Sequence, residues 1–196
     1  VAKITKPRAA RGRERFLSGD ERDRLLSACK ASRSQFLYPV VVLAISTGMR
    51  RGEIMGLRWK QVDLANNCLR LSETKNDTSR SIPLAGLALT LMVQLSKVRR
   101  IDSELVFYGR DKAQAIDLKK PWETALRKAD IDDFRFHDLR HTAASYLAMN
   151  GATTVEIAAV LGHKTLQMVK RYSHLANSHT AGVVASMNRK IFEQPE

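Results

Sequence analysis

The chain is poor in cysteine, and it lacks apolar runs long enough to cross a bilayer. Its two cysteines, Cys29 and Cys68, lie far apart and form no CxxC pair, so the sequence indicates neither a disulfide framework nor a zinc site. The longest apolar run, from Val40 to Ile45, has the length of part of a core helix. The basic N-terminus is not followed by the apolar stretch of a signal peptide. A cytoplasmic protein with no membrane partner is therefore expected.

Acidic residues are scarce relative to basic ones. The 20 Asp and Glu residues face 33 Lys and Arg residues, which gives a formal charge of +13. Such an excess suggests a polyanionic partner, because neutralisation of phosphates drives nucleic-acid affinity. On charge alone, the alternative is a basic protein without such a partner. Residues 1–15 are strongly basic and have no apolar periodicity, which predicts an exposed arm or linker.

The rest of the chain, residues 16–196, is predicted to form one domain with a buried core, since 44 % of all residues are hydrophobic. A capping-box pattern at Ser18 and Glu21 opens the first helix. Short extended runs around the turn signal Asn66-Asn67 and at residues 81–84 predict a small antiparallel sheet, with 74–79 as its hairpin loop. The fold class is therefore mainly α with a small β-sheet (α+β). Further helices are predicted near residues 34–46, 50–57, 87–98, 113–129, 137–149, 154–162, 165–172 and 178–192.

Two basic motifs lie at predicted helix starts. In TGMRRGE, Arg50 and Glu53 are three residues apart and could pair, either as a surface ion pair or as part of a site. In HDLRH, His137 and Arg140 share a helix face, where an imidazole and a guanidinium can bind one phosphate and exchange a proton. The alternative is that His137 caps the helix and Arg140 is solvated. His141 is expected to face partly inward as a packing or hydrogen-bonding residue.

A third motif, LGH, ends a predicted helix, and Tyr172 follows His163 by nine residues. Taken singly, neither residue is informative, and Tyr172 could be a half-buried core tyrosine. His174 is expected to be structural. No HExxH motif is present and no carboxylate is placed to complete a histidine site, so no metal is predicted.

In order, the motifs TGMRRGE, TKNDTSR before IPL, HDLRHTAASYL, LGH and YSHL resemble the catalytic domain of tyrosine recombinases (phage integrases and Xer-type resolvases). The match spans Ser18 to about Leu175. The resemblance implies that fold, and DNA cleavage and rejoining through a 3′-phosphotyrosine, without metal or cofactor. It implies that two arginines, a hairpin lysine, two histidines and a nucleophilic tyrosine are catalytic, in that order Arg50 and Arg140, Lys75, His137 and His163, and Tyr172. Glu53 is implied to support the site.

The resemblance also implies double-stranded DNA as the partner and a homotetramer on it, with residues 1–15 as the linker from an N-terminal core-binding domain. Two alternatives stay open: a type IB topoisomerase and a non-catalytic DNA-binding regulator. In the terminal helix, Val183, Met187 and Ile191 share an apolar face. This face could dock on a neighbouring protomer or fold back on its own core.

Overall fold

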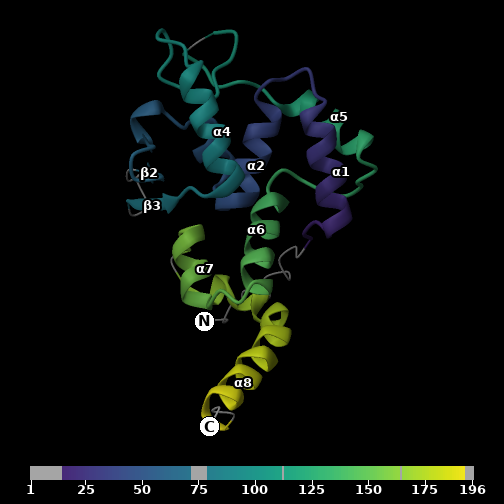
Figure 1. The fold of residues 1–196 in the computed structure, drawn as a ribbon. Coiled ribbons are helices and arrows are strands. Elements are labelled where there is room, and N and C mark those ends of the chain that lie inside the picture. The colour runs from purple at the N-terminus through teal and green to yellow at the C-terminus, as the bar shows by residue number, and fades with distance from the viewer. Residues whose placement is uncertain (1–14, 72–78, 112, 164, 193–196) are drawn as a thin grey trace, which may run out of the picture.

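The computed structural model describes residues 15–71, 79–111, 113–163 and 165–192, and it confirms a mainly helical domain with a small antiparallel sheet (Figure 1). None of the helices in these ranges is both long and apolar enough to span a membrane. The elements follow in the order α1 (Gly19–Lys30), α2 (Leu37–Thr47), α3 (Arg51–Met55), η1 (Trp59–Gln61), β1 (Val62–Asp63), β2 (Cys68–Leu71), β3 (Arg80–Pro83), α4 (Gly86–Lys97), α5 (Lys119–Lys128), α6 (Asp138–Met149), α7 (Thr154–Leu161), η2 (Leu166–Met168), η3 (Lys170–Ala176) and α8 (Asn177–Phe192).

The centre of the domain is α2, which is apolar all round, as expected of a helix that is buried on every side. It packs against α1, α4 and α6. The strands pair in the order β1-β2-β3, and the buried Leu69 and Ile82 lie opposite each other on β2 and β3. Asn67 has a positive φ of 50°, in agreement with the predicted turn.

A second, smaller apolar cluster lies at the far end of α6, where α7 and η3 pack against it. Ala144 and Ala148 of α6 contribute small side chains, which let α7 and η3 approach closely. Leu161, Val169 and Tyr172 fill the space between these elements. Because α6 packs against both α2 and η3, it joins the two clusters (Figure 1).

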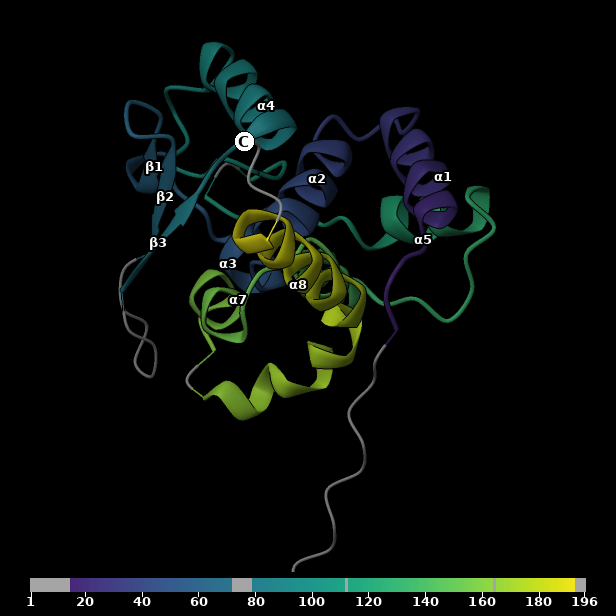
Figure 2. The same cartoon turned by 60° about the horizontal axis from the view of Figure 1, so that its bottom comes forward.

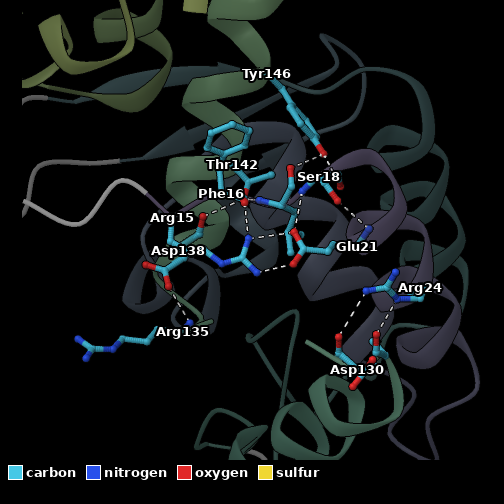
Figure 3. A network of polar contacts seen from close by, with 12 residues as sticks. Arg15, Phe16, Ser18, Glu21, Arg24, Asp130, Arg135, Asp138, Thr142 and Tyr146 are labelled. Carbon is cyan, nitrogen blue, oxygen red and sulfur yellow. Dashed lines mark hydrogen bonds and ion pairs between the residues drawn. The ribbon is translucent and has the colours of Figure 1, made fainter. Parts of the chain in front are cut away.

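Polar contacts join the start of α1 to α6 (Figure 3). The predicted capping box is confirmed, since Ser18 accepts from the backbone N–H of Glu21 and the Glu21 carboxylate accepts from that of Ser18. The Glu21 carboxylate also accepts from Arg15 over 2.9 Å. The N–H of Leu17 donates to Oγ1 of Thr142 on α6 over 3.1 Å. These contacts fix where the chain enters the domain.

Two predicted helices were wrong in extent. The helix expected over residues 113–129 begins at Lys119, because Ala115 instead forms a bridge with Tyr108 and Ile116 donates to the carbonyl of Phe107. The single helix expected over residues 165–172 is two 3₁₀ segments, η2 and η3. Both errors arise where contacts with other parts of the chain override local helix propensity.

The predicted terminal helix is present as α8, which extends away from the main body and contacts η3 (Figures 1 and 2). The apolar residues Val183, Met187 and Ile191 are each about half exposed, at 52 %, 48 % and 58 %. This face is therefore not folded back on its own core. The predicted linker, apart from Arg15, and Lys75 lie outside the described residues.

Candidate active site

Arg50 is positioned by the tight turn between α2 and α3. Gly48 ends α2 in the left-handed conformation (φ 63°), and Arg50 then occupies the N-cap position of α3. The Glu53 carboxylate accepts from the Arg50 backbone N–H over 2.7 Å and from its Nη1 over 3.1 Å. The predicted pairing of Arg50 with Glu53 is therefore confirmed, and one carboxylate holds both the backbone and the guanidinium of Arg50.

Arg140 reaches the same turn from α6. Its Nη1 donates to the carbonyl of Gly48 over 2.7 Å, and the residue is only 6 % exposed. The alternative of a solvated Arg140 is therefore wrong. The pKa of Arg140 is lowered to about 10, chiefly by burial and also by the nearby charges of Arg50 and Arg80. A buried cation beside two others is costly unless an anion joins it.

Arg80 is a member of the site that the sequence analysis did not assign. From the start of β3, its Nη2 donates to both carboxylate oxygens of Glu53, at 3.1 and 2.9 Å. Its Nε is buried without a hydrogen-bond partner in the described part of the chain. Glu53 thus holds two arginines from different elements. The sequence signal that could have indicated Arg80 is its place as the last residue of the TKNDTSR motif, directly before the predicted strand.

His163 follows the left-handed Gly162 at the end of α7. The pKa of His163 is lowered to about 4, chiefly by burial and also by the charges of the nearby arginines Arg140, Arg50, Arg171 and Arg80. Its Nδ1 is buried and finds no hydrogen-bond partner among the residues described. A neutral imidazole near four guanidinium groups forms a site that favours an anion.

Tyr172 lies on η3 and is 5 % exposed. Its Oη is 2.5 Å from Nδ1 of His141, so the expectation that His141 is a hydrogen-bonding residue is confirmed. Tyr172 also raises the pKa of Arg140 electrostatically, which places the phenol next to the cluster of arginines. The tyrosine is thus both part of the second apolar cluster and adjacent to the candidate anion site.

His137 occupies the N-cap position of α6, but its side chain makes no capping hydrogen bond. The Asp138 carboxylate instead accepts from the backbone N–H of Arg135 over 2.8 Å. The His137 ring is exposed and lies 5.5 Å from the His141 ring, nearly perpendicular to it at 88°. His137 therefore lies on the accessible side of the site.

The structure thus brings together five of the predicted residues and places His137 beside them: Arg50, Glu53, Arg140, His163 and Tyr172. The remaining predicted catalytic residue, Lys75, lies outside the described ranges, between Leu71 and Arg80, which pair at the ends of β2 and β3. Arg80 and Arg171 join the cluster without having been predicted. No group of three or more His, Cys, Asp or Glu residues suited to a metal ion occurs in the described ranges.

Comparison with solved structures defines the class of domain. The catalytic domain of bacteriophage HP1 integrase superimposes with a TM-score of 0.67 and is 26 % identical, and the match covers 90 % of this chain and 96 % of that one. The fold is that of a tyrosine recombinase catalytic domain. Residues 15–179 match the phage integrase family, and the chain belongs to that family.

Two curated relatives are similar over most of the chain. The shufflon-specific DNA recombinase of Escherichia coli is 37 % identical over 176 residues, which cover 89 % of this chain and 44 % of that protein. The integrase of Salmonella phage P22 is 30 % identical over 188 residues, covering 90 % of this chain and 48 % of the relative. The chain therefore spans about half the length of these relatives.

Proposed function

We propose that the chain catalyses site-specific DNA recombination by cutting and rejoining DNA through a 3′-phosphotyrosine at Tyr172. The observation that carries this proposal is the convergence of four arginines around the neutral His163, with the phenol of Tyr172 beside them. Family membership and the names of the relatives, a DNA recombinase and a phage integrase, support DNA as the anion.

In this mechanism, the guanidinium groups of Arg50 and Arg140 bind the non-bridging oxygens of the scissile phosphate. They offset the charge that develops in the pentavalent transition state, and they are already held in place by Glu53 and the Gly48 carbonyl. Two further groups, His163 and Arg80, would lie beside the same phosphate. Because binding groups are fixed before the reaction, little reorganisation is needed as charge develops.

Proton transfers accompany the attack. A free phenol has a pKa of about 10, so Tyr172 must lose its proton as it attacks phosphorus. The family resemblance assigns proton acceptance to His137. The 5′-oxygen must gain a proton to leave, and we assign that step to Lys75, because a lysine releases its proton more readily than an arginine. The covalent phosphotyrosine conserves the phosphodiester energy, so that a DNA 5′-hydroxyl can reverse the step.

The complete protein is proposed to act as a homotetramer on double-stranded DNA, with residues 1–15 as a linker from a core-binding domain. The exposed apolar face of α8 fits this assembly, because Val183, Met187 and Ile191 would be covered by a second copy. Crosslinking of the chain on DNA, with and without α8, tests the assembly. If assembly did not change without α8, this docking role would be excluded.

The test of the activity uses nicked duplexes with a randomised centre as suicide substrates. Covalent protein–DNA adducts are captured and their DNA is sequenced, and the recovered sequence becomes the substrate for later assays. We expect adducts with the wild-type chain and none with Tyr172→Phe. Adduct formation by the variant would show a different nucleophile, whereas binding with no adduct from either chain would favour the non-catalytic regulator. Adducts accompanied by supercoil relaxation without strand exchange would favour the topoisomerase.

A further inference from the structure

The phenol of Tyr172 has a defined partner, and the tyrosine itself is buried. Its Oη lies 2.5 Å from Nδ1 of His141, and the tyrosine is 5 % exposed. The two residues come from η3 and α6, which pack against each other around the second apolar cluster. A short hydrogen bond between two elements that pack against each other is more fixed in geometry than a contact between exposed side chains.

The surroundings of His141 favour a neutral imidazole. Burial lowers its pKa from the ordinary value of 6.5, and the charges of His137, Arg171 and Arg140 act in the same direction. The charge of Asp138 acts in the opposite direction. A neutral imidazole has one ring nitrogen that can accept a proton, and here Nδ1 is the nitrogen that faces the phenol.

We propose that His141, rather than His137, directly accepts the phenolic proton of Tyr172 during DNA cleavage. This inference rests on the proposed strand cleavage at Tyr172. A nucleophile within hydrogen-bond reach of a neutral base is the arrangement that activates a hydroxyl group. His137 is exposed and its ring is 5.5 Å from that of His141, which suits a role on the DNA side of the site.

The step conserves atoms and charge. The O–H bond of Tyr172 breaks, and its proton moves to Nδ1 of His141, which becomes an imidazolium. The electron pair that remains on the phenolic oxygen forms the bond to phosphorus, while the bond to the 5′-oxygen breaks and that oxygen takes a proton from the general acid. When the phosphotyrosine is resolved, the imidazolium returns the proton to Tyr172.

The same charges make this proton transfer depend on DNA. An imidazolium at His141 would lie near the cations of Arg140 and Arg171, which disfavour it in the free protein. A phosphate bound at the arginines supplies negative charge and reduces this repulsion. Tyr172 is therefore activated when the scissile phosphate is in place, and the phenol stays protonated without it.

The first experiment uses the free chain. Nitrogen-15 NMR of the histidine rings at pH 7.5 should show His141 neutral, with the proton on Nε2 and Nδ1 as an acceptor. The Nδ1 signal should change in Tyr172→Phe, which removes the hydroxyl and retains the ring. A proton on Nδ1 in the wild-type chain would overturn the proposal, because that nitrogen could not then accept one.

The second experiment measures single-turnover cleavage of the suicide substrate as a function of pH. His141→Asn retains a side-chain oxygen that can accept a hydrogen bond, but it cannot take up a proton. We expect both His141→Asn and His141→Ala to slow cleavage by about 100-fold or more. The wild-type rate should fall on the acidic side as His141 becomes protonated, and this fall should disappear in both variants. His174→Asn is the control, because His174 lies on η3 two residues from Tyr172 and is exposed.

A rescue experiment distinguishes His141 as a general base from His141 as a residue that only positions Tyr172. Replacing Tyr172 with a fluorinated tyrosine lowers the phenol pKa and so reduces the need for a base. This replacement should restore much of the rate of His141→Asn and change the wild-type rate far less. Full activity in His141→Asn with loss in His141→Ala would show positioning only. Faster cleavage in both variants would show that His141 restrains the nucleophile. Either result overturns the proposal while Tyr172-dependent adducts still support the activity.

Discussion

Gly162 and Arg80 lie so close together that a Cβ at position 162 would displace the Arg80 guanidinium. A Cβ there would be 1.9 Å from Nη1 of Arg80 and 2.6 Å from its Cζ, and the φ of Gly162 is 68°. The end of α7, which leads to His163, is thus packed directly against the guanidinium that donates to Glu53. This contact joins the end of α7, the start of β3 and α3 in one site.

Gly162→Ala is therefore expected to impair the site more than the fold. The alanine would adopt a strained φ and displace Arg80 from Glu53, at a cost of about 1–3 kcal/mol in the free energy of unfolding. Cleavage of the suicide substrate should fall by at least 10-fold. Gly182→Ala is the control, because a Cβ there meets nothing within 4 Å, and in helix α8 it should be neutral or slightly stabilising. Equal effects of the two changes would contradict this packing argument.

Arg140→Lys should lose most of the cleavage rate although it keeps a positive charge. A lysine lacks the planar fork that lets one guanidinium donate to the Gly48 carbonyl and also reach a phosphate. We expect a decrease of about 100- to 1,000-fold in single-turnover rate. Arg127→Lys, at an exposed position on α5, serves as the control and should cleave normally. Wild-type cleavage by Arg140→Lys would show that charge alone suffices.

The protonation of His163 should report anion binding. Its pKa is about 4 in the free chain because of burial and four arginines, and a bound phosphate favours the charged imidazole. NMR titration of the His163 ring in inorganic phosphate should therefore give a higher pKa than in chloride, and phosphate should bind more tightly as the pH falls. An identical pKa in both buffers would place the anion elsewhere. The exposed His174 provides the reference signal.

Glu21 is expected to contribute to stability in a pH-dependent way. The hydrogen bond from Arg15 is the largest factor that lowers the pKa of Glu21 to about 2, from 4.5. Because its folded-state pKa is depressed, the contribution is present above about pH 4.5 and is lost as the pH falls towards 2. Glu21→Gln should lower the free energy of unfolding at pH 7 by about 1–2 kcal/mol.

Denaturant unfolding at pH 7 and at pH 3 checks this prediction, since the difference between Glu21→Gln and the wild-type chain should shrink at the lower pH. The exposed Glu123 on α5 provides a matched change, Glu123→Gln, with little expected effect. A constant difference across this pH range would show that the carboxylate charge of Glu21 is not responsible.

Local signals in the sequence determined much of the fold. The capping box at Ser18 and Glu21 and the pairing of Arg50 with Glu53 are interactions between near neighbours, and the structure confirms both of them. Residues 113–118 were predicted wrongly because their partners, such as Tyr108, belong to a different segment, and such pairing leaves no helical or alternating pattern.

The order of motifs also indicated which residues form the site, but only tertiary structure decided how they meet. Arg140 contacts a carbonyl 92 positions away, Arg80 joins Glu53 from a strand, and Tyr172 faces His141 rather than His137. These relationships depend on how α6, β3 and η3 pack, which spacing along one helix does not encode. The sequence by itself indicated a set of basic residues of the kind that can bind a phosphate. Packing decided that Tyr172 is buried beside His141 and that the pKa of His141 is lowered, because burial and neighbouring charges, not residue type, set which groups hold protons.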